Sequence, residues 1–303
     1  MSIRPVDRTS LATATVEGAG VNLHRAFGFH DPKRFDPFLL FDDFRGDHPR
    51  DYMGGFPWHP HRGIETITYV LAGSVEHGDS LGNAGTLKSG DVQWMTAGSG
   101  ILHQEMPKGN GRGQMHGFQL WANLPRDLKM TAPRYQDVRA RDIPEILEDD
   151  GTVVKVITGN FWGRSGPVDG IAADPLYLDI YVPPLRSKRF PIDTRRKAFA
   201  YVFEGAGKFA DASGPQGVLL EKEVMGQEVN IRDLSGNRTL VQFGKGDEVA
   251  VQAGPEGLRF LLVAGAPIQE PVAWHGPIVM NTAEELRTAM ADLKNGTFIK
   301  PAH

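Results

Sequence analysis

Two short polar motifs, separated by a stretch rich in β-forming residues, constrain this chain more than any other part of its sequence. The sequence His-Pro-His covers residues 59–61, and His-Gln-Glu covers residues 103–105. Side chains on a strand alternate between its two faces, so the outer members of each motif point the same way. Three imidazoles and one carboxylate can therefore converge. We predict a metal site formed by His59, His61, His103 and Glu105.

The residues between the two motifs favour strands joined by tight turns. Residues 65–71 are rich in β-branched and aromatic side chains, and a turn at Gly73 follows them. A second turn at Gly90 precedes the short strand predicted over residues 92–95, and residues 97–100 break the chain before the second motif. The pattern predicts a small β-barrel that brings both motifs to one interior point.

The composition fits β structure and excludes several kinds of chemistry. The chain has 303 residues, enough for two domains, with 36 Gly and 21 Pro. It has no Cys, which excludes disulfides, zinc–thiolate sites and thiol nucleophiles. A formal net charge of −4 argues against direct nucleic-acid binding. Without a long apolar run or a signal-peptide core, we expect a cytoplasmic protein with no membrane partner.

Several longer runs resemble the pirin family of cupins. These runs are Phe35–Phe44, His59–Thr66, Gly90–Gly98, Gly100–His103 and Gly276–Thr282. The resemblance extends over essentially the whole chain. It implies an all-β bicupin, that is, two tandem cupin β-barrels, and it implies iron as the metal.

Glu65 is the one competing carboxylate. By strand parity it shares a face with His59 and His61, unless the strand bulges at Gly63. The pirin resemblance gives the ligand role to Glu105 instead. Glu65 would then be a neighbouring or structural carboxylate.

The second half of the sequence repeats the first. The run Tyr69–Gly73 matches Tyr201–Gly205, and Gly90–Gly98 matches Gly246–Gly254 at a larger offset. Residues 125–134 are charged, bounded by proline and non-periodic, as a domain connection would be. We therefore expect a metal-binding barrel over residues 1–135 and a second barrel over residues 136–303.

The four ligand positions are not repeated in the second half. His59 and His61 correspond to Pro191 and Asp193, and the other two ligands correspond to Arg259 and Leu261. We expect this barrel to lack metal ligands. Near its end, a capping box at Thr282 predicts a short helix with an apolar stripe of Leu286, Ala289, Met290 and Leu293, stopped at Gly296.

Other candidate residues receive plainer interpretations. We assign residues 1–50, including His24, His30 and His48, to the outer wall of the first barrel. His116 either lines the metal cavity or is a hydrogen-bonded core residue. Among the tryptophans Trp58, Trp94 and Trp121, we favour Trp58 as a wall of an aromatic pocket because it adjoins a ligand.

The ligand set indicates the type of metal. Three neutral imidazoles and a carboxylate suit Fe(II), Mn, Ni, Co or Zn and argue against Cu(I). Four protein ligands leave two open positions on an octahedral ion. The pirin resemblance makes Fe(II) our prediction, with one ion per chain.

Two functions from different classes follow from the resemblance. The first is a quercetin 2,3-dioxygenase-like oxidoreductase, which opens the central ring of a flavonol with O₂ and releases carbon monoxide. Its partners would be a small aromatic substrate and O₂, and Glu105 would be the catalytic base. The second is an iron-binding, redox-sensitive regulator that acts by protein–protein interaction, as a transcription co-regulator or as the partner of a metabolic enzyme.

Overall fold

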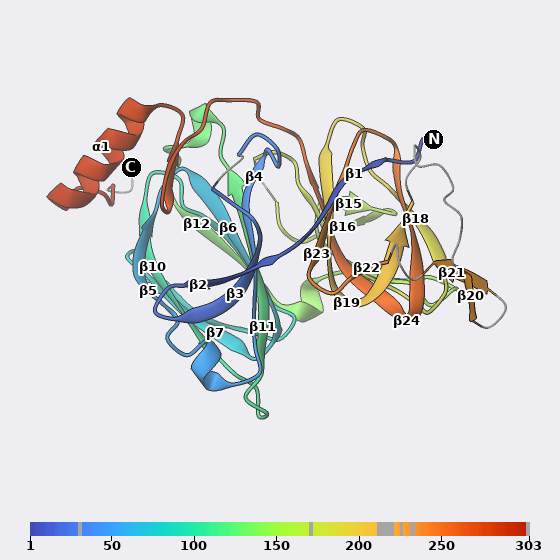
Figure 1. The fold of residues 1–303 in the computed structure, drawn as a ribbon. Coiled ribbons are helices and arrows are strands. Elements are labelled where there is room, and N and C mark those ends of the chain that lie inside the picture. Colours follow the sequence, from blue (N-terminus) through green and yellow to red (C-terminus); the bar gives the residue numbers. More distant parts are fainter. Residues whose placement is uncertain (30–31, 170–171, 211–220, 225–226, 231–233, 301–303) are drawn as a thin grey trace. The chain divides into compact units, whose positions relative to one another are not determined.

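The fold is all-β apart from one α-helix and three short 3₁₀ turns, which are η1 (Pro49–Asp51), η2 (Arg126–Leu128) and η3 (Ala140–Asp142) (Figure 1). The computed structural model describes residues 1–29, 32–169, 172–210, 221–224, 227–230 and 234–300. His30, one of the histidines assigned above, lies outside these residues. The fold class predicted from the sequence is confirmed.

Two antiparallel sheets and a hairpin form the N-terminal barrel, which comprises residues 13–142, 172–173 and 268–300. The seven-stranded sheet contains, in spatial order, β12 (Arg134–Val138), β9 (Val92–Thr96), β6 (Ile64–Ala72), β11 (Met115–Asn123), β4 (Phe38–Gly46), β3 (Val21–Phe27) and β2 (Thr13–Glu17). The four-stranded sheet contains β5 (Phe56–His61), β10 (Ile101–Lys108), β7 (Ser74–Asp79) and β8 (Ala84–Lys88), and the hairpin pairs β25 (Ala273–His275) with β26 (Ile278–Met280).

Strand periodicity determines which side chains of this barrel are buried. Along β10, residues alternate between fully and partly buried from Ile101 to Pro107. This is the period of two expected when one face of a strand is covered more completely than the other. His103 and Glu105 fall on the fully buried face of β10.

The C-terminal barrel comprises the described parts of residues 1–12, 143–169 and 174–267. Its main sheet contains β1 (Val6–Leu11), β23 (Thr239–Phe243), β19 (Lys197–Phe209), β24 (Glu248–Gly265), β17 (Leu176–Val182), β14 (Val153–Thr158) and β13 (Glu145–Leu147), with β18 (Ser187–Pro191) and β22 (Ser235–Gly236) paired at its sides. Two hairpins complete it, β15 (Asn160–Phe161) with β16 (Arg164–Ser165), and β20 (Glu221–Val224) with β21 (Gln227–Asn230).

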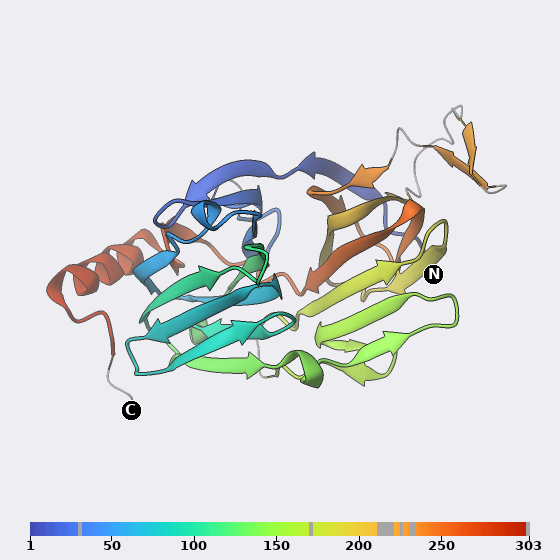
Figure 2. The same ribbon diagram turned by 90° about the horizontal axis from the view of Figure 1, so that it is seen from below.

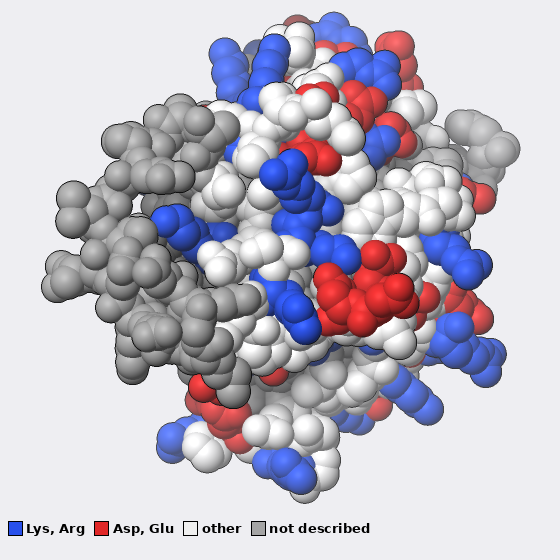
Figure 3. All heavy atoms as spheres, turned by 90° about the vertical axis from the view of Figure 1, so that its right-hand side faces the viewer, with Lys and Arg blue, Asp and Glu red and all other residues white. Residues whose placement is uncertain are grey.

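An apolar cluster fills the core of the C-terminal barrel. It includes Val156, Leu178, Phe190, Val251 and Phe260, each at most 3% exposed. On the face drawn in Figure 3, Lys and Arg side chains form a band beside a cluster of Asp and Glu, so the charges there are mixed. In the described part of the chain, no helix is long and apolar enough to cross a membrane.

Neither barrel is continuous in sequence. The first strand, β1, pairs with β23 and so belongs to the C-terminal barrel. The segment from Ile268 onward belongs to the N-terminal barrel, and the change between the two units in mid-chain falls at Asp142/Ile143. Contacts therefore divide the chain differently from the linear split at residue 135, because strand pairing joins residues that are distant in sequence.

The C-terminal helix, α1 (Ala283–Asn295), begins and ends where the sequence predicts. Thr282 Oγ1 accepts a hydrogen bond from the Glu285 backbone, the Glu285 side chain bonds back, and Gly296 ends the helix in the left-handed region. Leu286, Ala289 and Leu293 pack inward. Met290, predicted as part of this stripe, is 37% exposed, so that assignment is wrong.

Candidate metal centre

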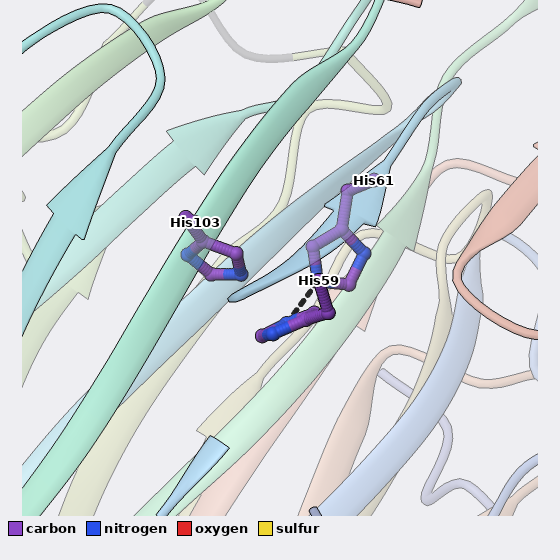
Figure 4. Close-up of side chains that lie close together, drawn as sticks. All are labelled: His59, His61 and His103. Atoms are coloured by element: carbon purple, nitrogen blue, oxygen red, sulfur yellow. Dashed lines mark hydrogen bonds between the residues drawn. The ribbon is translucent and has the colours of Figure 1, made fainter. Parts of the chain in front are cut away.

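Three of the four predicted ligands come together inside the N-terminal barrel. His59 and His61 lie on β5, and His103 lies directly opposite His59 on the neighbouring strand β10. Figure 4 shows the three rings turned toward one another. One nitrogen of each ring lies within 4.8 Å of those of the other two, and Nε2 of His59 is 3.0 Å from Nε2 of His61.

The environment favours the neutral form of two of these imidazoles. Burial, together with the neighbouring His103 and His59, holds the pKa of His61 well below its ordinary value. Burial and the nearby His59 and His77 lower the pKa of His103 in the same way. Since only a neutral imidazole can ligate a metal, His61 and His103 are in their binding-competent form near neutral pH.

The unpaired nitrogens of the cluster fit a metal. Both ring nitrogens of His103, and Nδ1 of His61, are buried without a hydrogen-bond partner. Nδ1 of His59 lies 2.8 Å from the Pro57 carbonyl oxygen, which leaves its Nε2 facing the other rings. Buried polar atoms without partners are costly, and a metal ion in the centre, which takes one nitrogen from each ring, would satisfy one of the two on His103. Among the described residues, this is the one group of three or more potential ligands that could hold an ion.

Glu105 lies beside this group but is not part of it. The register between β10 and β5 shifts between His103 and Glu105. The carboxylate accepts hydrogen bonds from Thr68 Oγ1 at 2.8 Å and from Gln119 Nε2 at 3.1 Å. Glu105 nevertheless lines the same cavity as His59 and His61.

Glu65 occupies a different environment. Its Oε1 accepts a hydrogen bond of 2.7 Å from Thr96, and it lies outside the histidine group. Burial raises its pKa to about 7, because the hydrogen bond from Thr96 only partly offsets desolvation. Strand β5 ends at His61, and Gly63 has a φ of 77° before β6 begins at Ile64. The turn at Gly63 thus breaks the parity that would have placed Glu65 beside the histidines.

His59 and His61 line a cavity of about 270 Å³. This is close to the lower end of the range of about 300–1,000 Å³ typical of ligand pockets. Its apolar lining includes Leu23, Phe29, Leu40, Phe44, Phe56 and Trp121, and its polar lining includes Glu17, Arg25, Asp42, Glu105 and Gln119. An apolar pocket with a few polar groups suits a small aromatic ligand.

A partly buried ion pair in this cavity was missed by the sequence analysis. Arg25 donates to both carboxylate oxygens of Asp42, at 2.8 and 2.7 Å, and to Glu17 at 2.8 Å. Burial raises the pKa of Asp42 to about 6, although Arg25 opposes this shift. Alternate residues in the middle of β3 and β4 line the cavity, so assigning residues 1–50 to an outer wall is wrong for these two strands. These residues are Leu23, Arg25, Leu40, Asp42 and Phe44.

The structure also settles the positions of the other candidates. Trp121 lines the cavity with its ring edge toward His61, at 5.1 Å between centroids. Trp58, the favoured candidate, is 52% exposed and does not line the cavity, whereas Trp94 is buried. His116 Nε2 lies 3.3 Å from Asp43 Oδ1 and outside the cavity lining, which supports its interpretation as a core residue.

The corresponding positions in the C-terminal barrel have ordinary structural surroundings. Asp193 pairs with Arg195, and Arg259 makes two hydrogen bonds to Asp179. Leu261 is fully buried, and Pro191 ends β18. The site geometry of the first barrel is therefore not repeated at these positions.

Comparison with known proteins identifies relatives over nearly the whole chain. The family model "Pirin" matches residues 20–122, and the model "Pirin C-terminal cupin domain" matches residues 177–299. A pirin-like protein of Caulobacter vibrioides is 43% identical over 98% of this chain and 100% of its own length. A Pseudomonas aeruginosa protein, provisionally named as a quercetin 2,3-dioxygenase, is 38% identical over 92% of this chain and 93% of its own.

Solved structures show the same fold. The crystal structure of quercetin 2,3-dioxygenase from Acinetobacter baumannii matches with a TM-score of 0.84 and 29% identity, covering 98% of this chain and 99% of the other. The bacterial pirin YhhW of Escherichia coli, in complex with nickel(II), matches with a TM-score of 0.62 and 20% identity, covering 86% and 100%. The second match shows the fold alone.

Proposed function

The chain belongs to the pirin family, and from this premise we propose that it is a metal-dependent dioxygenase acting on a flavonol such as quercetin. It would convert the flavonol and O₂ into a ring-opened ester and carbon monoxide. The observation that carries the proposal is the cluster of three histidines, two of which line a largely apolar cavity. The names of the Pseudomonas relative and the Acinetobacter structure support the same reaction class.

We assign His59, His61, His103 and Glu105 as the ligands of one divalent ion, with Fe(II) as the ion. Nitrogen and carboxylate donors suit Fe(II), and Mn, Ni, Co and Zn fit the same donor set. When bound, the ion would supply Lewis-acid and redox chemistry and lower the pKa of the flavonol 3-hydroxyl group.

The chain's own side chains would bind and orient the substrate. The apolar walls around Trp121 would take the flat rings and exclude water. Glu105 would accept the proton of the 3-hydroxyl group, since its carboxylate lines the same cavity as the histidines. Gln119 and Thr68 would hold that carboxylate in place during the transfer.

The test is a turnover experiment on reconstituted protein. Metal-free protein would be loaded with Fe(II) under nitrogen, and quercetin loss and O₂ uptake would be followed after mixing with air-saturated buffer. We expect equimolar consumption of both, with release of carbon monoxide. The His103→Ala variant and free Fe(II) are the controls. If the loaded wild type consumes no more flavonol than free Fe(II), the dioxygenase proposal is wrong.

A further inference from the structure

The C-terminal segment, residues 276–299, contacts both strands that carry the histidines. Gly276 and Pro277 line the metal cavity itself. Farther along, Ile278, Met280, Ala289 and Phe298 form a buried apolar cluster, and Leu102 of β10 packs against it. Leu102 directly precedes His103. Figures 1 and 2 both show α1 on the outside of the N-terminal barrel.

Arg62, the residue after His61, is tied to this segment at both its backbone and its side chain. Its guanidinium donates to Asp292 Oδ2 and to the Phe298 carbonyl, each at 2.8 Å, and lies 4.2 Å from the centroid of the Phe298 ring. Its backbone carbonyl accepts from Val279 N at 3.0 Å. The side chain is 2% exposed. A buried guanidinium bonded to two sites on one segment fixes the position of the adjoining strand end.

The turn after Arg62 is held by a second buried basic side chain. Lys129 Nζ donates to the carbonyl oxygens of Gly63 and Val279, at 2.8 and 3.0 Å, and to Asn123 Oδ1 at 2.6 Å. A Cβ atom on Gly63 would lie 2.0 Å from the Val279 carbonyl oxygen. Only glycine allows this close approach, so the turn that follows β5 packs directly on the C-terminal segment.

The start of β10 is packed in the same way. A Cβ atom on Gly100 would lie 2.8 Å from the Phe298 carbonyl oxygen, and Gly100 has a φ of 136°. Phe298 therefore contacts the residue before β10 and the residue after β5. One side chain with its backbone thus bridges the ends of both histidine-bearing strands.

We infer that the C-terminal segment is a clamp that positions the metal ligands, with Arg62 and Phe298 as its main positioning residues. This inference rests on the proposed ligands His59, His61 and His103. When the clamp is docked, the two strand ends are already in place and less reorganisation accompanies metal binding. Because coupling between two sites is reciprocal, a bound metal must also strengthen the docking of α1. Metal occupancy is thereby transmitted to an exposed helix.

A matched control exists in the C-terminal barrel. Arg4 is 1% exposed and donates to the carbonyl oxygens of Gly244, Asp193 and Arg196, at 2.9, 2.8 and 3.0 Å. It anchors a terminal segment as Arg62 does, but it lies in the other unit. A general loss of stability should affect Arg62→Met and Arg4→Met alike, whereas loss of the clamp should affect only the former.

The experiment uses the full chain loaded with Co(II), whose visible spectrum reports ligand geometry. We would measure the rate of Co(II) release to excess chelator in wild type, Arg62→Met, Arg4→Met and the milder Asp292→Asn. Outer groups that orient metal ligands typically change affinity by about 10–100-fold. We expect release from Arg62→Met to be at least about tenfold faster, with a shifted spectrum, and release from Asp292→Asn to be intermediate. Arg4→Met should release Co(II) at the wild-type rate and show the wild-type spectrum.

Hydrogen exchange of α1 provides the second measurement. In wild type, amides of residues 286–295 should exchange more slowly with Co(II) bound than without it, and Arg62→Met should lose this difference. The proposal of a clamp is wrong if Arg62→Met and Arg4→Met release Co(II) at the same rate. It is also wrong if the amides of wild-type α1 exchange identically with and without Co(II). If Arg62→Met does not fold, the same two measurements, Co(II) release and hydrogen exchange of α1, are made on Asp292→Asn instead. Failure of wild type to bind Co(II) through the histidines would instead overturn the ligand assignment.

Discussion

Thr68 on β6 donates a hydrogen bond of 2.8 Å to Oε1 of Glu105 on β10, so a side chain of one sheet holds a carboxylate carried by the other. Gln119 on β11 completes the support with a bond of 3.1 Å to Oε2. Both donors are neutral. They orient the carboxylate toward the cavity without supplying a countercharge.

Replacing Glu105 with Gln should lower turnover more than it lowers flavonol binding. A general base typically contributes about 10²–10⁴-fold to a rate, and the amide cannot accept the proton. Because Glu105 is also a proposed ligand, metal content must be measured and rates given per bound ion. Thr68→Val is the matched variant, which keeps the carboxylate but loosens it, and we expect a smaller loss of about tenfold. Equal turnover per ion in wild type and Glu105→Gln would remove Glu105 from the catalytic role.

Removing a clustered histidine should release the metal without unfolding the protein. His61→Ala and His103→Ala each delete one ligand, while the strands keep their own apolar packing. We expect most of the metal to be lost, as measured by elemental analysis, with an unchanged far-ultraviolet circular dichroism spectrum. His48→Ala, an exposed histidine outside the cluster, should retain one ion per chain. Full metal retention in His61→Ala or His103→Ala would contradict the site.

Trp121→Ala should raise KM for the flavonol with little change in kcat. The indole lines the cavity and meets His61 edge-on, so it would contact the bound rings. Losing one large aromatic contact of about 1.5–3 kcal/mol corresponds to an increase of roughly tenfold or more. Trp58→Ala, which changes an exposed residue of β5, should leave both constants unchanged. The opposite result would mean that the substrate lies against Trp58.

Glu65 should make the protein less stable as pH rises. Its pKa in the folded state, about 7, lies above the ordinary value of 4.5. The protonated form is therefore favoured by folding, and this contribution is fully present below pH 4.5 and is lost as pH rises through 7. Glu65→Gln cannot ionise. In metal-free protein, the free energy of unfolding of Glu65→Gln minus that of wild type should increase between pH 5 and pH 8. We expect this increase to be up to about 3 kcal/mol.

Urea unfolding at the two pH values measures this gain. Glu76→Gln, at an exposed carboxylate, should show a much smaller change. If the difference between Glu65→Gln and wild type is the same at pH 5 and pH 8, Glu65 does not titrate in this range. Retention of metal by Glu65→Gln is a separate check that Glu65 is not a ligand.

Local patterns predicted much of this structure. The β-branched run before Gly73 became β6, and the capping box at Thr282 begins α1, because both depend on interactions within a few residues. Strand parity also placed His59 and His61 on one face. The same parity argues against Trp58 as a cavity residue, since a neighbour of His59 on a strand must face the other way.

Features that depend on distant partners could not be predicted. Asp42 and Arg25 look like surface charges in the sequence, yet each satisfies the other inside the cavity. The pairing of β1 with β23 and the docking of Arg62 on Phe298 join residues more than two hundred positions apart. No local pattern encodes such contacts. Predicting them requires knowing which elements meet in three dimensions.

The division of each barrel along the chain has a consequence for biosynthesis. β1 leaves the ribosome early, but its partner β23 is among the later strands to emerge. The N-terminal barrel, in turn, waits for residues 268–300, which are translated after the whole C-terminal barrel. Neither unit can close until these later segments have been made, so unpaired strand edges stay exposed during elongation. A nascent chain stalled near residue 135 would carry all three histidines but lack the segment that packs against them.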